Sequence, residues 1–155
     1  MKFDRKLLAV GAAAACAWLG SENTWAASDH TVTINALVSA KCKFNSSSST
    51  IVLAIDPAAT TSITAPGSVI YRCSRGTTPS FTLVSTSTGR STSGRLSAGS
   101  EGFTYGFSSS GTAPGGGMGA GQDRTHVVTI TVDQSLAANV TPATYSDTIV
   151  ISVNP

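Results

Sequence analysis

Residues 145–155 read YSDTIVISVNP, and this stretch decides how the fold is interpreted. From residue 149 to residue 153 every second residue is apolar, which is the two-residue period of a β-strand that buries one face. The residues predicted to face the core are Ile149, Ile151 and Val153. The chain ends two residues after this strand, at Pro155, which leaves no sequence for a further strand beside it. We therefore expect the last strand to lack a neighbour on one side.

A second alternating stretch, SDHTVTINALVSAKC, occupies residues 28–42. Alternation persists over residues 31–44, about twice the usual strand length of roughly five to six residues. Counting back by twos from Cys42 places one set of side chains on a common face: Val32, Ile34, Ala36 and Val38. The opposite face carries Thr31, Thr33 and Asn35. Two interpretations remain open here, a surplus strand or an ordinary first strand with a disordered lead.

The chain begins with the pattern of a secretory signal peptide. Three basic residues precede an apolar run over residues 7–19, and Thr24 and Ala26 provide small residues before a cleavage site at Ala27. The run is shorter than the roughly 20 residues that a membrane-spanning helix needs. We therefore assign residues 1–26 to a signal peptide. A lipoprotein site at Cys16 is a minor alternative.

Removal of the signal peptide leaves two cysteines, Cys42 and Cys73. In an exported protein a disulfide is the expected state of such a pair. Closing a loop of this length stabilises a fold by roughly 3 to 4 kcal/mol on the chain-entropy model. Seven basic and six acidic side chains remain out of 10 and 8, so the charge is almost balanced. This balance argues against nucleic acid as a partner.

The remaining 129 residues of the 155 are predicted to form one all-β domain. Ser, Thr, Gly, Val and Ile dominate, and no segment keeps helical spacing over three turns. Predicted strands cover residues 31–44, 51–55, 68–73, 81–85, 103–107, 126–132 and 144–153. Turn signals separate them, including APGS at 65–68 and a Gly-rich stretch at 112–123. About seven strands fit an immunoglobulin-type β-sandwich.

The sequence offers no constellation for catalysis or for a cofactor. His30 and His126 lack cysteine or acidic partners at metal-binding spacing, and we predict both to be surface strand residues. No Gly-x-Ser-x-Gly motif occurs, and the carboxylates are scattered singly. The loose Gly-x-Gly-x-x-Ala pattern over residues 115–120 is followed by a strand pattern, so a flexible surface loop is the preferred interpretation.

These residues resemble the spore coat protein U domain family, the pilin type of the archaic chaperone-usher pathway. The resemblance covers nearly all of residues 29–155. It rests on the alternating segment leading into Cys42, on SVIYRCSRG around Cys73, on GRL and FTYGF, and on the closing PATYSDTIVISV. Its most specific part is Tyr145 and Asp147 followed by the alternating strand.

The resemblance implies an incomplete immunoglobulin-like sandwich that lacks its C-terminal strand and is completed by donor-strand exchange. Residues 27–38 would be the donor strand, and residues 39–155 the pilin domain. Val32, Ile34, Ala36 and Val38 would fill a groove in a neighbouring copy, beside the last strand with its Ile149, Ile151 and Val153. The main chain of such a strand binds by β-augmentation, while alternate side chains fill pockets.

The resemblance also implies partners and a location. A periplasmic chaperone would hold the subunit first, and an outer-membrane usher would then exchange it into a homopolymeric pilus outside the cell. The expected role is that of a shaft subunit supporting adhesion and biofilm formation, without enzymatic activity. The alternative is a secreted monomeric β-sandwich, either a binding module that uses loop 108–123 or a spore-coat component. A secreted hydrolase dependent on His126 is a third hypothesis, and no residue constellation supports it.

Overall fold

The computed structural model describes residues 29–155, so the predicted signal peptide lies outside the described residues. Leu37–Pro155 form a compact unit whose regular elements are β-strands apart from one short 3-10 helix. The elements are β1 (Cys42–Phe44), β2 (Ser62–Cys73), β3 (Ser80–Ser85), β4 (Ser93–Ala98), β5 (Glu101–Ser110), β6 (Arg124–Asp133), the 3-10 helix η1 (Gln134–Ala137) and β7 (Ile149–Asn154). The predicted all-β fold is therefore confirmed.

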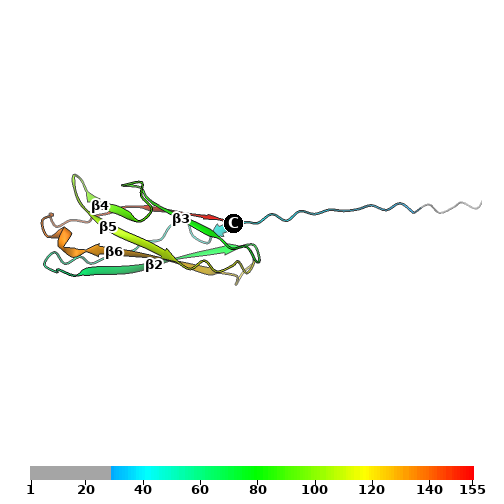
Figure 1. The fold of residues 1–155 in the computed structure, drawn as a ribbon, viewed down its shortest axis with the longest axis horizontal. Helices are drawn as coiled ribbons and strands as arrows, with labels where there is room; N and C mark the ends of the chain where they lie inside the picture. Colours follow the sequence, from blue (N-terminus) through cyan, green and yellow to red (C-terminus); the bar gives the residue numbers. More distant parts are fainter. Residues whose placement is uncertain (1–28) are drawn as a thin grey trace, which may run out of the picture. The chain divides into compact units, whose positions relative to one another are not determined.

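The strands form two sheets that face each other (Figure 1). One sheet has the order β1-β2-β6-β5-β4, and the other contains only β3 and β7. An immunoglobulin sandwich of the constant type has strands A, B, E and D in one sheet and C, F and G in the other. Here β1, β2, β6 and β5 occupy the positions of A, B, E and D, with β4 added at the edge. β3 and β7 correspond to C and F, and no described strand occupies the position of G.

The core between the sheets is built from inward-facing side chains of β5 and β6. Period-two alternation in both strands places their apolar residues on one face. The buried cluster comprises Leu83, Phe103, Tyr105, Phe107, Val128, Ile130, Val132 and Ala137. Ile149 and Ile151 of β7 pack against it and remain half-buried.

The predicted turn APGS is wrong, because residues 65–68 continue β2. Pro66 pairs with Thr129 of β6, whereas β1 covers only the last three residues of β2. β2 is thus an edge strand at Pro66, where a missing N–H is tolerated. At Gly67 a Cβ would overlap Cδ1 of Ile51, so the glycine makes room for that side chain.

Other strand predictions are corrected in their bounds. Within residues 31–44 only β1 is a strand, and residues 51–55 and 144–148 are outside the strands. These segments alternate as strands do, but no neighbouring strand holds them in a ladder. β4 was missed because its residues are mainly Ser, Gly and Arg and carry turn signals. Within residues 29–155, no helix has the length and apolar character needed to cross a membrane.

Candidate functional site

The candidate site is the open edge of β7. β7 pairs antiparallel with β3, from Ser80 opposite Asn154 to Ser85 opposite Ile149. No described strand pairs with its other edge. In an antiparallel sheet, alternate residues direct their N–H and C=O groups to each neighbour, so half of these backbone groups lack a strand partner here. Such an edge is a template for another strand.

The side chains beside this edge are apolar on the inward face. Ile149, Ile151 and Val153 are half-buried, in strict alternation with exposed residues. Val150 on the outward face is 51% exposed. This orientation agrees with the alternation in the sequence, and the assignment of the three inward residues to an acceptor groove stays a prediction.

Residues 51–55 form a second apolar segment without a strand partner. Ile51, Leu53 and Ile55 are half-buried and pack against the core, while Val52 is 82% exposed. The backbone N–H and C=O groups of these five residues make no hydrogen bond to the backbone of any described residue. The segment therefore has one face buried like a strand and an unpaired backbone.

The predicted donor residues lie in residues 29–38, which contain no strand. Val32, Ile34 and Val38 are 72%, 87% and 88% exposed, and Ala36 is exposed as well. Large apolar side chains are seldom exposed in a contiguous series on a soluble chain. Their function as a donor strand stays a prediction.

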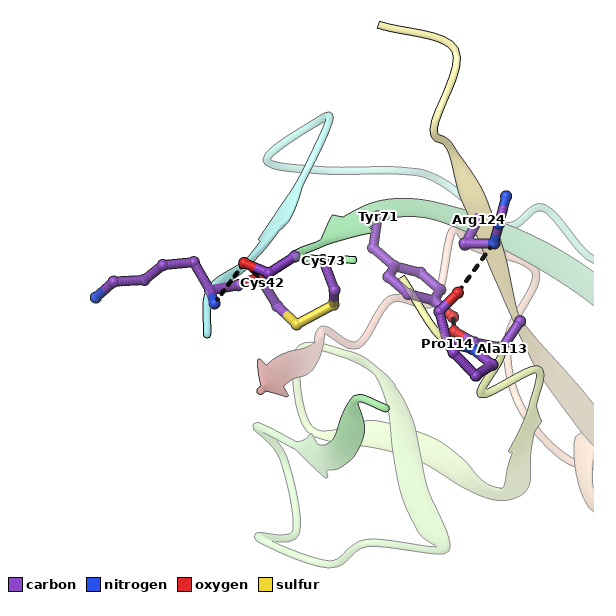
Figure 2. Close-up of a disulfide and its surroundings, with 8 residues drawn as sticks. Cys42, Tyr71, Cys73, Ala113, Pro114 and Arg124 are labelled. Carbon is purple, nitrogen blue, oxygen red and sulfur yellow. Dashed lines mark hydrogen bonds between the residues drawn. A yellow bond between two sulfur atoms is a disulfide. The ribbon is translucent and has the colours of Figure 1, made fainter. Parts of the chain in front are cut away.

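Cys42 and Cys73 form the predicted disulfide, with their Cα atoms 4.1 Å apart (Figure 2). The two residues are direct cross-strand partners at the ends of β1 and β2. Lys41 is fixed beside them, because its N–H donates to Ser74 Oγ at 3.0 Å and its carbonyl accepts from the Ser74 N–H at 2.8 Å. The disulfide therefore fixes the point at which the N-terminal segment joins the sheet.

Asp147, two residues before β7, lies at the centre of a hydrogen-bond network. Its carboxylate accepts from Ser85 Oγ at 2.7 Å, Ser87 Oγ at 2.8 Å and Tyr105 OH at 2.7 Å. The Thr148 N–H donates to it at 2.7 Å. Burial alone would raise the pKa of Asp147, but these hydrogen bonds outweigh it and hold the pKa at about 2. Burial, followed by the bond to Asp147, raises the pKa of Tyr105.

Tyr145, the other residue of the sequence motif, ties the same segment to β5. Its hydroxyl donates to Glu101 Oε2 at 3.0 Å and lies 2.7 Å from the carbonyl oxygen of Thr141. Thr141 also donates to Glu101 through its hydroxyl and its N–H, and these bonds lower the pKa of Glu101. The motif thus anchors the chain before β7. Its partners Tyr105 and Ser85 could not be identified from the sequence, because they are distant along the chain.

The prediction that His126 is a surface residue is wrong, since it is 1% exposed. Its ring stacks on Phe81 at a centroid distance of 3.7 Å, and Nδ1 lies 3.0 Å from the carbonyl oxygen of Gly111. His126 shares the inward face of β6 with Val128, which explains its burial. His30 is exposed as predicted, but it does not lie in a strand. Across residues 29–155, no group of three or more His, Cys, Asp or Glu residues is suited to hold a metal ion.

The Gly-rich stretch is a loop, but it is anchored at its centre. The Gly115 N–H donates to Thr77 O at 2.8 Å, and the Gly76 N–H donates back to Gly115 O at 2.9 Å. Gly115 is buried, and a Cβ there would overlap the carbonyl oxygen of Cys73. Arg124 Nε donates to Pro114 O at 3.2 Å (Figure 2). The loop borders a cavity of about 750 Å³ lined by Arg124 and Arg75.

Comparison with models of known protein families finds no matching family, and comparison with curated proteins finds no match. A solved structure that matches is the CsuC-CsuE chaperone-tip adhesion subunit pre-assembly complex from archaic chaperone-usher Csu pili of Acinetobacter baumannii. The TM-score is 0.46 at 16% identity, over 75% of this chain and 40% of that chain. This chain thus spans less than half of the matched chain.

Proposed function

We propose that this chain is a structural subunit of an extracellular pilus of the chaperone-usher type. Each copy inserts its N-terminal strand into the groove of a neighbouring copy and so builds a shaft that supports adhesion and biofilm formation. The observation that carries the proposal is the sheet order, in which β7 occupies the position of strand F and no described strand occupies that of G.

The N-terminal segment has the chemistry of the missing strand. It is long enough for a full strand, and its apolar face, Val32, Ile34, Ala36 and Val38, is exposed. Burial of the three larger side chains would stabilise the contact by roughly 5 to 9 kcal/mol before ordering costs. The backbone would at the same time satisfy the open edge of β7.

If the N-terminal strand of each copy binds to a neighbouring copy and not to its own domain, the copies assemble into a fibre. A head-to-tail contact of this kind does not close on itself and so propagates. Before assembly, the half-buried residues Ile149, Ile151 and Val153 need cover. In the proposed pathway a periplasmic chaperone covers them first, and an outer-membrane usher then exchanges the chaperone for the next subunit. The chain thus functions as a member of the spore coat protein U type of pilin, secreted through its signal peptide and active without catalysis.

Deletion of residues 29–38 tests the proposal. The deleted chain should keep the Cys42–Cys73 disulfide and bind a synthetic peptide of residues 29–38, because its groove is intact. It should form no ladder of polymers on a denaturing gel run without heating, whereas the full chain forms one. Fibres from the deleted chain alone would refute donor-strand assembly.

A mixing experiment adds a directional control. The deleted chain accepts a strand but donates none, so a small proportion of it should terminate growing polymers and shorten the ladder. The same proportion of a chain with Ile151→Asp in β7 should terminate at the opposite end, because that chain donates but accepts poorly.

A further inference from the structure

Charge is distributed unequally between the two ends of the domain. One end contains the start of β1, the end of β2 and the start of β6, since Cys42 pairs with Cys73 and Tyr71 with Arg124. Five basic residues and one acidic residue lie there: Lys41, Lys43, Arg72, Arg75, Arg124 and Asp123. Only Arg72 and Asp123 form an ion pair among the described residues, so this end is basic.

Two of the basic residues at this end, Arg75 and Arg124, place their guanidinium groups at one cavity. Arg75 and Arg124 line the cavity of about 750 Å³, whose lining contains no acidic residue. Arg75 makes no side-chain hydrogen bond to a described residue, and Arg124 bonds only to carbonyl oxygens. Unpaired guanidinium groups bind carboxylates well.

The opposite end is acidic. Asp133 ends β6, nine residues and about 30 Å from Arg124. Asp56 is placed there because its N–H donates to Gln134 of η1, and Glu101 because it starts β5. With Asp147 these are four acidic residues against two basic ones, Arg90 and Arg95. Within the described residues, every group that donates a hydrogen bond to these four carboxylates is uncharged.

The proposed strand exchange brings these ends together. Strand G of an immunoglobulin sandwich runs antiparallel to strand F, so the donor must run antiparallel to β7. Val32 then lies near the end of β7 and Val38 near its start, at Ile149. Three residues, 39–41, link Val38 to Cys42, a reach of at most about 14 Å. The basic end of the donor subunit therefore faces the acidic end of the acceptor.

We propose that the basic end of one subunit docks on the acidic end of a second copy of this chain and steers its strand into the groove. The inference rests on the proposed function and adds a second contact to it. Facing charges of opposite sign accelerate association and fix orientation, and added salt weakens the effect. The charged ends would thus bind and orient the acceptor subunit before the donor strand inserts into its groove.

The test compares two rates in the same purified chain: assembly of whole chains, and insertion of a labelled peptide of residues 29–38. The variant Lys43→Glu with Arg75→Glu reverses two exposed side chains that make no hydrogen bond to a described residue. We expect assembly about tenfold slower in this variant, and likewise in the unchanged chain when salt rises from about 50 to about 500 mM. Peptide insertion should change less than about twofold, because the peptide has no basic end.

Arg90→Glu with Arg95→Glu is the matched control, since it makes the same change in net charge at the acidic end. Its assembly should be as fast as that of the unchanged chain, or faster. Adding Lys41→Glu, Asp56→Lys and Ser100→Lys to the slow variant gives the formerly basic end a net charge of about −2 and the formerly acidic end about +1. This exchange of signs should restore assembly.

Equal slowing of assembly by the two pairs of charge reversals, or no slowing by either pair, would overturn the steering contact. If the peptide still inserts in that case, the donor-strand proposal stands. Failure of the peptide to insert into any chain would overturn both.

Discussion

The hydroxyl of Tyr105 donates a hydrogen bond to the carboxylate of Asp147 at 2.7 Å. Tyr105 belongs to β5 of the five-stranded sheet, whereas Asp147 leads into β7 of the two-stranded sheet. Ser85 at the end of β3 binds the same carboxylate. The start of the open strand is thus bonded to both sheets, which holds β7 in place although no described strand pairs with one of its edges.

Asp147→Asn should lower the free energy of unfolding by about 1 to 3 kcal/mol, because a charged acceptor of several hydrogen bonds is lost. A carboxyl whose pKa is about 2 in the fold and about 3.9 when unfolded stabilises fully above about pH 4 and loses this effect as pH falls toward 2. Urea unfolding of both chains between about pH 2 and 6 measures the difference, which should shrink below about pH 4.

Tyr105→Phe serves as the control for that series, since it removes one donor and keeps the carboxylate. Tyr105→Phe should lower the free energy of unfolding less than Asp147→Asn does. This free energy should still fall with pH below about pH 4, because the carboxylate of Asp147 remains. A difference between the Asp147→Asn and unchanged chains that stays constant down to pH 2 would show that the network does not stabilise the ionised form.

Replacing both cysteines by serine should lower the free energy of unfolding by roughly 3 to 4 kcal/mol, because the unfolded chain regains the freedom of a closed loop. The sequence separation of 31 residues sets this magnitude. Guanidinium unfolding of the oxidised chain, the reduced chain and the double variant Cys42→Ser with Cys73→Ser measures it. Equal midpoints for all three would contradict the expectation.

Gly67→Ala should cost about 1 to 3 kcal/mol, because the new methyl group overlaps the side chain of Ile51. Gly106→Ala in β5 is the matched control, since its nearest atoms are 3.9 Å from the Cβ position. Thermal unfolding compares the two. Adding Ile51→Ala to Gly67→Ala should remove the overlap, so that the two changes are not additive; simple additivity would argue against the contact.

Ile34→Asp should abolish polymerisation, while Thr33→Asp should reduce it far less, because only residue 34 faces the groove in the proposed register. A charge buried in an apolar groove costs several kcal/mol, whereas an outward charge stays in water. Counting polymer steps on unheated gels measures both. Equal effects at the two positions would place the donor strand in another register.

Several features were predictable from local pattern alone. Alternation identified β3, β5, β6 and β7 and gave the inward face of β7, because a period of two is a property of the chain itself. The disulfide was expected from the predicted signal peptide and from the count of the remaining cysteines. In contrast, His126 was misassigned, since an inward orientation depends on which face of β6 the opposite sheet covers.

The amino-acid sequence by itself determined the all-β class, the pairing of Cys42 with Cys73 and the two apolar faces near the chain's ends. Only the tertiary structure decided that Pro66 continues a strand, that residues 51–55 lack a ladder, and that Asp147 joins three strands. The reason is physical. Periodicity and covalent chemistry are encoded in neighbouring residues, but the pairing of strands and the charge at each end depend on which distant segments the fold brings together.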